Sequence, residues 1–130
     1  MIRIISLALV LLSSCSLSSE QEGRIAKVVS VQEFKELIAK KTDVQLIDVR
    51  TPEEFKAGHL PKAVSIDYYK SDFKALLSKL DMEKPVAVYC AVGGRSGSTL
   101  KLLKSMGFKE AYDLSGGIRA WQKEKLPIER

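Results

Sequence analysis

The sequence predicts an α/β fold, with one domain built on a mostly parallel sheet that has helices on both faces. Short apolar runs that are typical of strands alternate along the chain with segments of helical periodicity. One of these runs, Val86–Tyr89, is apolar throughout, as expected of a strand that is buried on both faces of a parallel sheet. Glycine, proline and capping residues stand where one kind of segment gives way to the next.

The first part of the domain is predicted to hold three strands and two helices. Residues 25–29 are expected to form a short edge strand, and Ser30 with Glu33 forms a capping-box pattern that opens the next helix. The apolar face of that helix has helical spacing, with Phe34, Leu37 and Ile38. The elements expected after it are a strand at 44–47, a short helix between Thr51 and Gly58 that has Pro52 at its first position, and a strand at 63–66.

The second part continues the alternation. Apolar spacing predicts a helix between Tyr69 and Leu80, and the strand at 86–89 follows. The elements expected after it are a helix over 96–105, ended by Gly107, a strand at 111–114, and a short helix that follows Gly116 and carries Trp121. Ligands of open α/β sheets bind beyond the carboxyl ends of the strands, so Cys90 stands where a site is expected.

The amino terminus has the pattern of an export signal. Arg3 precedes an apolar run of about nine residues, which is shorter than the roughly 20 that span a bilayer. Leu12-Ser13-Ser14-Cys15 resembles the lipobox of bacterial lipoproteins, and this resemblance implies cleavage of residues 1–14 and lipidation of Cys15. The alternative is an ordinary cleaved signal. In the lipoprotein interpretation, residues 15–24 form a polar tether and residues 25–130 form the domain. The lipid anchors the domain to a membrane of the cell envelope, and the domain faces the periplasm in a Gram-negative host.

The charge pattern argues against nucleic-acid binding. The chain has 21 basic and 16 acidic residues, a net charge of +5, and the lysines are scattered among the acids at helical spacing. Runs of like charge and aromatic residues interleaved with basic ones, which mark a nucleic-acid surface, are missing from the sequence. The balance favours mild attraction to anionic membranes or small anionic substrates.

Cys90 is the candidate nucleophile. If Cys15 is lipidated, Cys90 is the remaining thiol and has no partner for an internal disulfide. The glycines of Val92-Gly93-Gly94-Arg95 let the backbone curl its N–H groups around one point, at a predicted helix amino terminus. These dipoles and the Arg95 charge predict a thiolate with a lowered pKa and a partly exposed sulfur. The alternative is a small buried core cysteine.

Three segments carry a resemblance to a known family. Cys90, Gly93, Arg95 and Ser96 stand as in the Cys-x-x-Gly-x-Arg-Ser loop of the rhodanese (sulfurtransferase) family. Residues 46–63 are similar to the amino-terminal signature of that family and residues 114–121 to its carboxyl-terminal one. In order along the chain, these segments cover roughly residues 30–125, so residues 25–130 are expected to be a single rhodanese-like domain.

The resemblance implies a chemistry. A Cys90 thiolate takes the sulfane sulfur from a small anionic donor such as thiosulfate and passes it, as a persulfide, to cyanide or a thiol. The loop residues that hold the sulfur are implied to be Ala91, Val92, Gly93, Gly94 and Ser96, with Arg95 orienting the loop first and meeting substrate second. Asp48 and Arg50 are implied to support the loop. Neither a metal nor an organic cofactor is required.

His59 and Trp121 are expected to have structural roles. His59 is the single histidine of the chain, but a thiolate made by the loop needs no base, so His59 is expected to be a structural turn residue. Trp121 is expected to pack in the core.

Other functions remain open from the sequence. Phosphatases with a related loop have Cys-x5-Arg, whereas Cys90 and Arg95 are separated by four residues, which makes a smaller loop. A sulfur relay or binding module with a specific protein partner is the closer alternative. A peroxide sensor is less favoured, because no resolving cysteine is available.

Overall fold

The computed structural model describes residues 23–130, so Cys15 and the predicted signal at 1–14 lie outside the described residues. The strands are β1 (Ile25–Val29), β2 (Gln45–Asp48), β3 (Val64–Ser65), β4 (Val86–Tyr89) and β5 (Glu110–Leu114). The helices are α1 (Val31–Lys40), α2 (Pro52–Ala57), α3 (Phe73–Leu77), α4 (Gly94–Met106) and α5 (Gly117–Lys123). Within residues 23–130, no helix is both long enough and apolar enough to cross a membrane.

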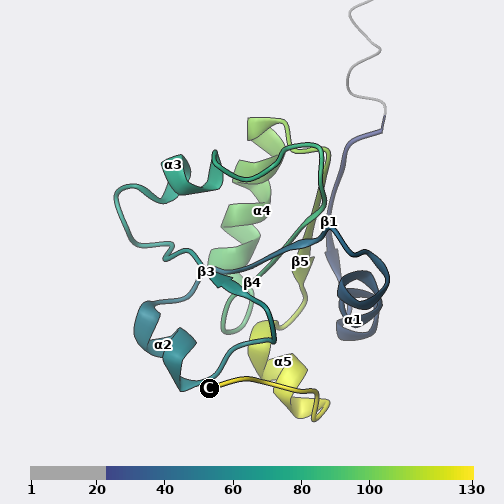
Figure 1. The fold of residues 1–130 in the computed structure, drawn as a ribbon, viewed down its shortest axis with the longest axis vertical. Coiled ribbons are helices and arrows are strands. Elements are labelled where there is room, and N and C mark those ends of the chain that lie inside the picture. The colour runs from purple at the N-terminus through teal and green to yellow at the C-terminus, as the bar shows by residue number, and fades with distance from the viewer. Residues whose placement is uncertain (1–22) are drawn as a thin grey trace, which may run out of the picture.

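The strands form one sheet in the order β1-β5-β4-β2-β3, and each of its pairings is parallel. β1 lies at an edge, as the sequence predicts, and β4 lies in the middle. Helices lie on both sides of the sheet (Figure 1). The predicted α/β fold with a parallel sheet is therefore confirmed.

The two faces of the sheet bury separate apolar clusters. Side chains alternate along β4, so Val88 faces the helices α3 and α4 while Ala87 and Tyr89 face α1 and α5. All four residues of β4 are fully buried, which explains why this strand is apolar without alternation. The helices contribute Phe73, Leu77, Leu100 and Leu103 to the first cluster, and Phe34, Ile118 and Trp121 to the second.

The helix expected between Tyr69 and Leu80 is wrong in length, because α3 covers only residues 73–77. A turn precedes it, in which Asp67 accepts the Tyr69 N–H with its side chain and the Lys70 N–H with its carbonyl. These local hydrogen bonds compete with a helical turn at this position. The other elements begin and end within two residues of their predicted positions, and α4 starts two residues early, at Gly94.

The fold brings three loops to one edge of the sheet. Parallel strands have their carboxyl ends on the same side, so the segments after β2, β4 and β5 lie there together. Because β4 is the middle strand, the loop that follows it lies between the other two. Cys90 is the first residue of this middle loop.

Candidate active site

Cys90 directly follows β4 and precedes the turn into α4. Its Sγ accepts a hydrogen bond from the Gly93 N–H at 3.1 Å, and the Ser96 hydroxyl donates to it at 3.3 Å. Gly93 has a φ of 118°, a left-handed conformation that residues with a Cβ rarely adopt. Donors to the sulfur thus come both from a glycine of the loop and from the first turn of α4.

The surroundings of Cys90 favour its ionised form. Burial raises the pKa of the Cys90 thiol, because a thiolate in the interior loses its hydration. Hydrogen bonds from the Ser96 hydroxyl and from the amides of Ser96, Gly93 and Val92 outweigh this effect, and the pKa lies below its ordinary value. The positive end of the α4 dipole acts in the same direction. The lowered pKa agrees with the expectation from the sequence.

The expected partial exposure of the sulfur is wrong, since Cys90 is only 1 % exposed. The cause is the place of β4, which is buried on both faces in the middle of the sheet, so that the residue after it is still inside. Cys90 packs in the same cluster as Val88 and Leu100. The sulfur is therefore buried, and its hydrogen-bond donors still lower the pKa of the thiol. A buried cysteine and a reactive thiol are alternatives from the sequence alone, but the structure combines the two.

The amino end of α5 holds the carbonyl groups that begin the loop. The Ile118 N–H donates to the Cys90 carbonyl at 2.9 Å, and the Arg119 N–H donates to the Ala91 carbonyl at 3.2 Å. The C=O and N–H of one trans peptide point in opposite directions. Fixing the Ala91 carbonyl toward α5 therefore leaves the next amide, that of Val92, directed at the sulfur, where it lowers the pKa of Cys90.

Gly117 permits this close approach. Its φ is 62°, and a Cβ at this position would lie 2.4 Å from the Ala91 oxygen and 2.5 Å from the Cys90 oxygen. No residue with a side chain fits against the loop at these distances. The sequence shows Gly116-Gly117 as a turn into a helix, but it does not show that the turn packs on the loop more than 20 residues earlier.

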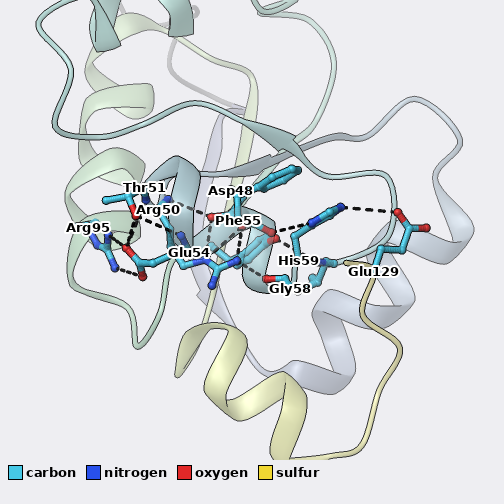
Figure 2. A network of polar contacts seen from close by, with 11 residues as sticks. Asp48, Arg50, Thr51, Glu54, Phe55, Gly58, His59, Arg95 and Glu129 are labelled. Carbon is cyan, nitrogen blue, oxygen red and sulfur yellow. Dashed lines mark hydrogen bonds and ion pairs between the residues drawn. The ribbon is translucent and has the colours of Figure 1, made fainter.

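Arg95 is held by a carboxylate of α2. Its Nη1 and Nη2 lie 2.7 and 3.0 Å from the two carboxylate oxygens of Glu54, as Figure 2 shows. The guanidinium also lies 5.6 Å from the ring centroid of Tyr69. The hydrogen bond to Arg95 is the largest cause that holds the pKa of Glu54 at about 2. The sequence predicts Glu54 only as a helix cap, so its second role was missed.

The cap itself is present. The Glu54 N–H donates to Thr51 Oγ1 at 3.3 Å, and Glu54 Oε1 accepts the Thr51 N–H at 3.3 Å. The same Oε1 accepts from Arg95. One carboxylate thus closes the first turn of α2 and fixes the residue that precedes Ser96.

Asp48 and Arg50 form a buried ion pair behind the site. Arg50 Nη2 lies 2.7 Å from Asp48 Oδ2 and also donates to the Gly58 carbonyl at 2.7 Å (Figure 2). These contacts join the end of β2 to the end of α2, and the guanidinium lies 5.7 Å from the Tyr89 ring centroid. The side-chain hydrogen bonds of Arg50 go to Asp48 and to the Gly58 carbonyl, so this ion pair holds α2, and with it Glu54, rather than the sulfur.

His59 and Trp121 have structural surroundings. The His59 ring stacks on Phe55 at 3.8 Å, and its Nδ1 lies 2.9 Å from the Phe55 carbonyl. The His59 backbone pairs with Glu129, which fastens the carboxyl-terminal segment. Trp121 is buried and its indole N–H donates to the Pro127 carbonyl. In the part of the chain that the structure describes, no cluster of three or more His, Cys, Asp or Glu side chains could hold a metal ion.

The profile of the rhodanese-like domain matches residues 30–124, which is most of the chain. The chain belongs to the rhodanese-like domain family. It is 38% identical over 96 residues to the thiosulfate sulfurtransferase GlpE of Coxiella burnetii, covering 74% of this chain and 87% of that protein. It is 30% identical over 100 residues to a sulfurtransferase of Allochromatium vinosum, covering 77% of this chain and 92% of that protein.

Solved structures agree with this assignment. A rhodanese-related protein from Thermoplasma volcanium has a TM-score of 0.70 at 27% identity, over 79% of this chain and 97% of that one. A rhodanese-like domain protein from Staphylococcus aureus has a TM-score of 0.67 at 30% identity, over 80% of this chain and 99% of that one. At the level of the family, these likenesses support sulfurtransferase activity for this rhodanese-like domain.

Proposed function

We propose that the protein is a sulfurtransferase that carries a sulfane sulfur as a persulfide on Cys90. The observation that carries the proposal is the set of hydrogen bonds that Cys90 Sγ accepts, among them those from the Gly93 amide and the Ser96 hydroxyl. These hydrogen bonds lower the pKa of the thiol. A thiolate that is stabilised in this way is a nucleophile without the help of a base.

The transfer has two steps. In the first, the Cys90 thiolate attacks the outer sulfur of thiosulfate, the sulfur–sulfur bond of the donor breaks, and sulfite leaves with the electron pair. In the second, cyanide or a thiolate attacks the outer sulfur of the persulfide, and Cys90 leaves as the thiolate again. The negative charge of the enzyme stays on the Cys90 sulfur or on the outer sulfur of its persulfide. The main-chain dipoles around this position are fixed, so they stabilise the charge in both steps without reorganising.

Arg95 has a mainly orienting role in this proposal. Both of its terminal nitrogens donate to the carboxylate of Glu54, so these hydrogen bonds join Arg95 to α2 and not to a substrate. The positive charge of Arg95 remains near the sulfur. Arg95 is close enough to Cys90 for its positive charge to attract the thiolate. The same charge attracts an anionic donor to the site.

The test is the intact mass of the purified full chain after incubation with thiosulfate. The expected result is a gain of the mass of one sulfur atom, removed by cyanide with formation of thiocyanate. Cys90→Ser is the matched control, because it keeps the size of the side chain and should show no gain. Finding the same gain in Cys90→Ser, or none in the parent chain, would falsify the proposed step with this donor.

A second candidate is sulfur exchange with a protein partner instead of a small molecule. The observation that favours it is the exposure of two apolar side chains beside the site, Val92 at 57 % and Tyr69 at 70 %. If this candidate holds, a persulfide-bearing protein loads Cys90 faster than thiosulfate does, and Val92→Ser slows the protein donor more than it slows thiosulfate. Equal slowing of both donors would contradict it.

We also propose that the domain is attached to a membrane of the cell envelope through a lipid on Cys15. The support is the pattern Leu12-Ser13-Ser14-Cys15 after an apolar run, followed by a polar segment. With this anchor, sulfur transfer takes place outside the cytoplasm.

A further inference from the structure

Asp113 is a buried carboxyl group that the proposed transfer does not use. It lies on β5 between Val28 of β1 and Val88 of β4, and it is only 2 % exposed. Its Oδ1 is buried and has no hydrogen-bond partner among residues 23–130. A buried carboxyl oxygen without a donor costs free energy, so a residue of this kind calls for an explanation.

Asp113 lies on the same face of the sheet as Cys90. Ala111, two residues earlier on β5, belongs to the cluster that contains Val88 and Cys90, and side chains two residues apart in a strand share a face. The first turn of α4 covers this face, because a Cβ on Gly97 would lie 3.8 Å from Asp113 Oδ2. The carboxyl and the sulfur are therefore under the same turn of α4.

Ser96 lies between the two groups. It is fully buried, its hydroxyl donates to Cys90 Sγ at 3.3 Å, and it is close enough to Asp113 to oppose the effect of burial on that carboxyl. A hydroxyl has one proton to donate and can accept a hydrogen bond at the same time. An ionised Asp113 competes with the Cys90 thiolate for the Ser96 proton, whereas a protonated Asp113 donates to Ser96 Oγ and leaves that proton to the sulfur.

We infer that Asp113 is a positioning residue for Cys90, which in its protonated form directs the Ser96 hydroxyl toward the thiolate. The inference rests on the proposed use of Cys90 as a thiolate. No bond to sulfur changes in this step, and the proton on Asp113 is exchanged with solvent or with the thiol. Thiolate formation on Cys90 is thereby coupled to the protonation of Asp113, and the two groups titrate as a pair.

The electrostatic surroundings favour this coupling. The pKa of Asp113 is raised to about 6, because the effect of burial exceeds the opposing effect of the hydrogen bond from Ser96. Ionisation of Cys90 favours the protonated carboxyl further, because two buried negative charges repel each other. Asp113 forms no ion pair among residues 23–130. The charged and titratable groups on the elements packed against it are Tyr89 of β4, Cys90 after β4, Lys27 of β1, and Arg95, Lys101 and Lys104 of α4. Tyr89 lies on the opposite face of the sheet, in the cluster that contains Trp121.

These groups are engaged elsewhere or face away from Asp113. Lys27 lines a groove with Leu37 and Tyr112, on the opposite face of the sheet. Arg95 is paired with Glu54, and Lys101 and Lys104 are exposed. Cys90 is therefore the titratable group on this face to which Asp113 responds through Ser96.

The test is the pH titration of the Cys90 thiolate, followed by its ultraviolet absorbance in the full chain carrying Cys15→Ser. The spectrum of the same chain with Cys90→Ser is subtracted, which removes the tyrosines. Asp113→Asn keeps the shape of the side chain, and its amide NH₂ group is a permanent hydrogen-bond donor for Ser96 Oγ. We expect it to raise the thiolate-to-thiol ratio at neutral pH at least about threefold, a shift of about half a pKa unit, and to turn a two-step titration into one step.

The control is Asp43→Asn, which removes an exposed carboxylate between α1 and β2 and should leave the titration unchanged. In a Ser96→Ala background, the effect of Asp113→Asn should shrink to less than half, since the hydroxyl that carries it is gone. A titration of Asp113→Asn that superimposes on the parent, or an equal effect with and without Ser96, would overturn the inference.

The readout separates this inference from the proposed function, because it measures the thiolate and not sulfur transfer. A chain that shows the Asp113 coupling but takes no sulfur from thiosulfate keeps the inference and loses the function with that donor. If Asp113→Asn lacks a cooperative unfolding transition, Asp113→Ser, which is smaller and neutral, carries the same test. Failure of both variants to fold would make Asp113 a requirement of the core and overturn the inference.

Discussion

Glu54 shows how a single side chain serves two elements. Its Oε1 accepts from the Thr51 N–H at the start of α2 and from Arg95 at the start of α4. The second oxygen completes a two-point contact with the guanidinium, a geometry that fixes orientation as well as distance. Arg95 is therefore held in place before any substrate arrives.

This pair predicts a pH dependence of stability. The pKa of Glu54 is lowered to about 2, mainly by its hydrogen bond to Arg95, so its contribution is present above the unfolded pKa near 4.5 and is lost as the pH falls toward 2. Because the Glu54 side chain is 34% exposed, the contribution is screened to about 0.5–1 kcal/mol. We expect Glu54→Gln to lower the free energy of unfolding by about that amount at pH 7 and by less at about pH 3.

Urea denaturation at the two pH values measures this difference. Glu53→Gln is the matched control, because Glu53 is the exposed neighbour in the same turn of α2. The account of Glu54 is wrong if the two variants lose the same stability at both pH values.

At the scale of elements, the loop after β4 depends on the packing of α5 against it. Two amides of α5 bind the carbonyls of Cys90 and Ala91, and this leaves the amides of the loop to the sulfur. The carboxyl-terminal signature of the family thus has a physical role here, since Gly117 lets α5 come close enough to make these bonds.

A methyl group at residue 117 should push the two elements apart. We expect Gly117→Ala to lower the free energy of unfolding by about 2 kcal/mol or more, through the left-handed φ and the contact with two backbone oxygens. The displaced loop should also raise the pKa of Cys90. Urea denaturation and the thiolate absorbance measure the two effects.

Gly107→Ala separates strain from contact. Gly107 has a φ of 93° as well, but an added Cβ would meet only the flexible side chains of Met82 and Arg24, at 3.4 and 3.6 Å. We expect about 1 kcal/mol of destabilisation and an unchanged thiolate titration. An equal rise of the Cys90 pKa in both variants would show that the contact of α5 with the loop is not what positions the amides.

At the scale of the whole molecule, the strand order assembles the site. Placing β4 between β5 and β2 brings together Cys90, Gly117 at the start of α5 and Glu54 in the first turn of α2, which are far apart in the sequence. Each segment contributes a different function: the nucleophile, the support of its backbone, and the anchor of Arg95. The parallel sheet is needed for this arrangement because it gives all three loops the same edge.

The proposed anchor can be tested in cells. We expect the full chain to incorporate a labelled fatty acid and to have an intact mass that begins at Cys15 with its lipids. Cys15→Ser should lose the label, whereas Cys90→Ser, the matched cysteine control, should keep it. Persulfide formation on Cys90 should not change in Cys15→Ser, because the contacts of the loop come from residues 48–119. A labelled Cys15→Ser chain would contradict the anchor.

Most of the fold follows from local patterns. The alternation of apolar runs and helical periodicity, with caps such as Thr51 and Gly107, predicts the elements to within two residues except at α3. At α3 the apolar spacing extends beyond the ends of the helix, because apolar residues in a turn can pack like those of a helix. The Asp67 side chain accepts the Tyr69 N–H and so favours a turn over a helix before α3.

The sequence by itself determined the family, the parallel α/β architecture, the position of Cys90 at a strand end and the glycines that let the loop curl. These are properties of residue type and spacing within a short segment. Only the tertiary structure decided that the sulfur is buried, that Glu54 holds Arg95, that Gly117 supports the loop and that Asp113 lies under the same turn as Cys90. Each of these depends on the packing of segments distant in the chain, which no local pattern encodes.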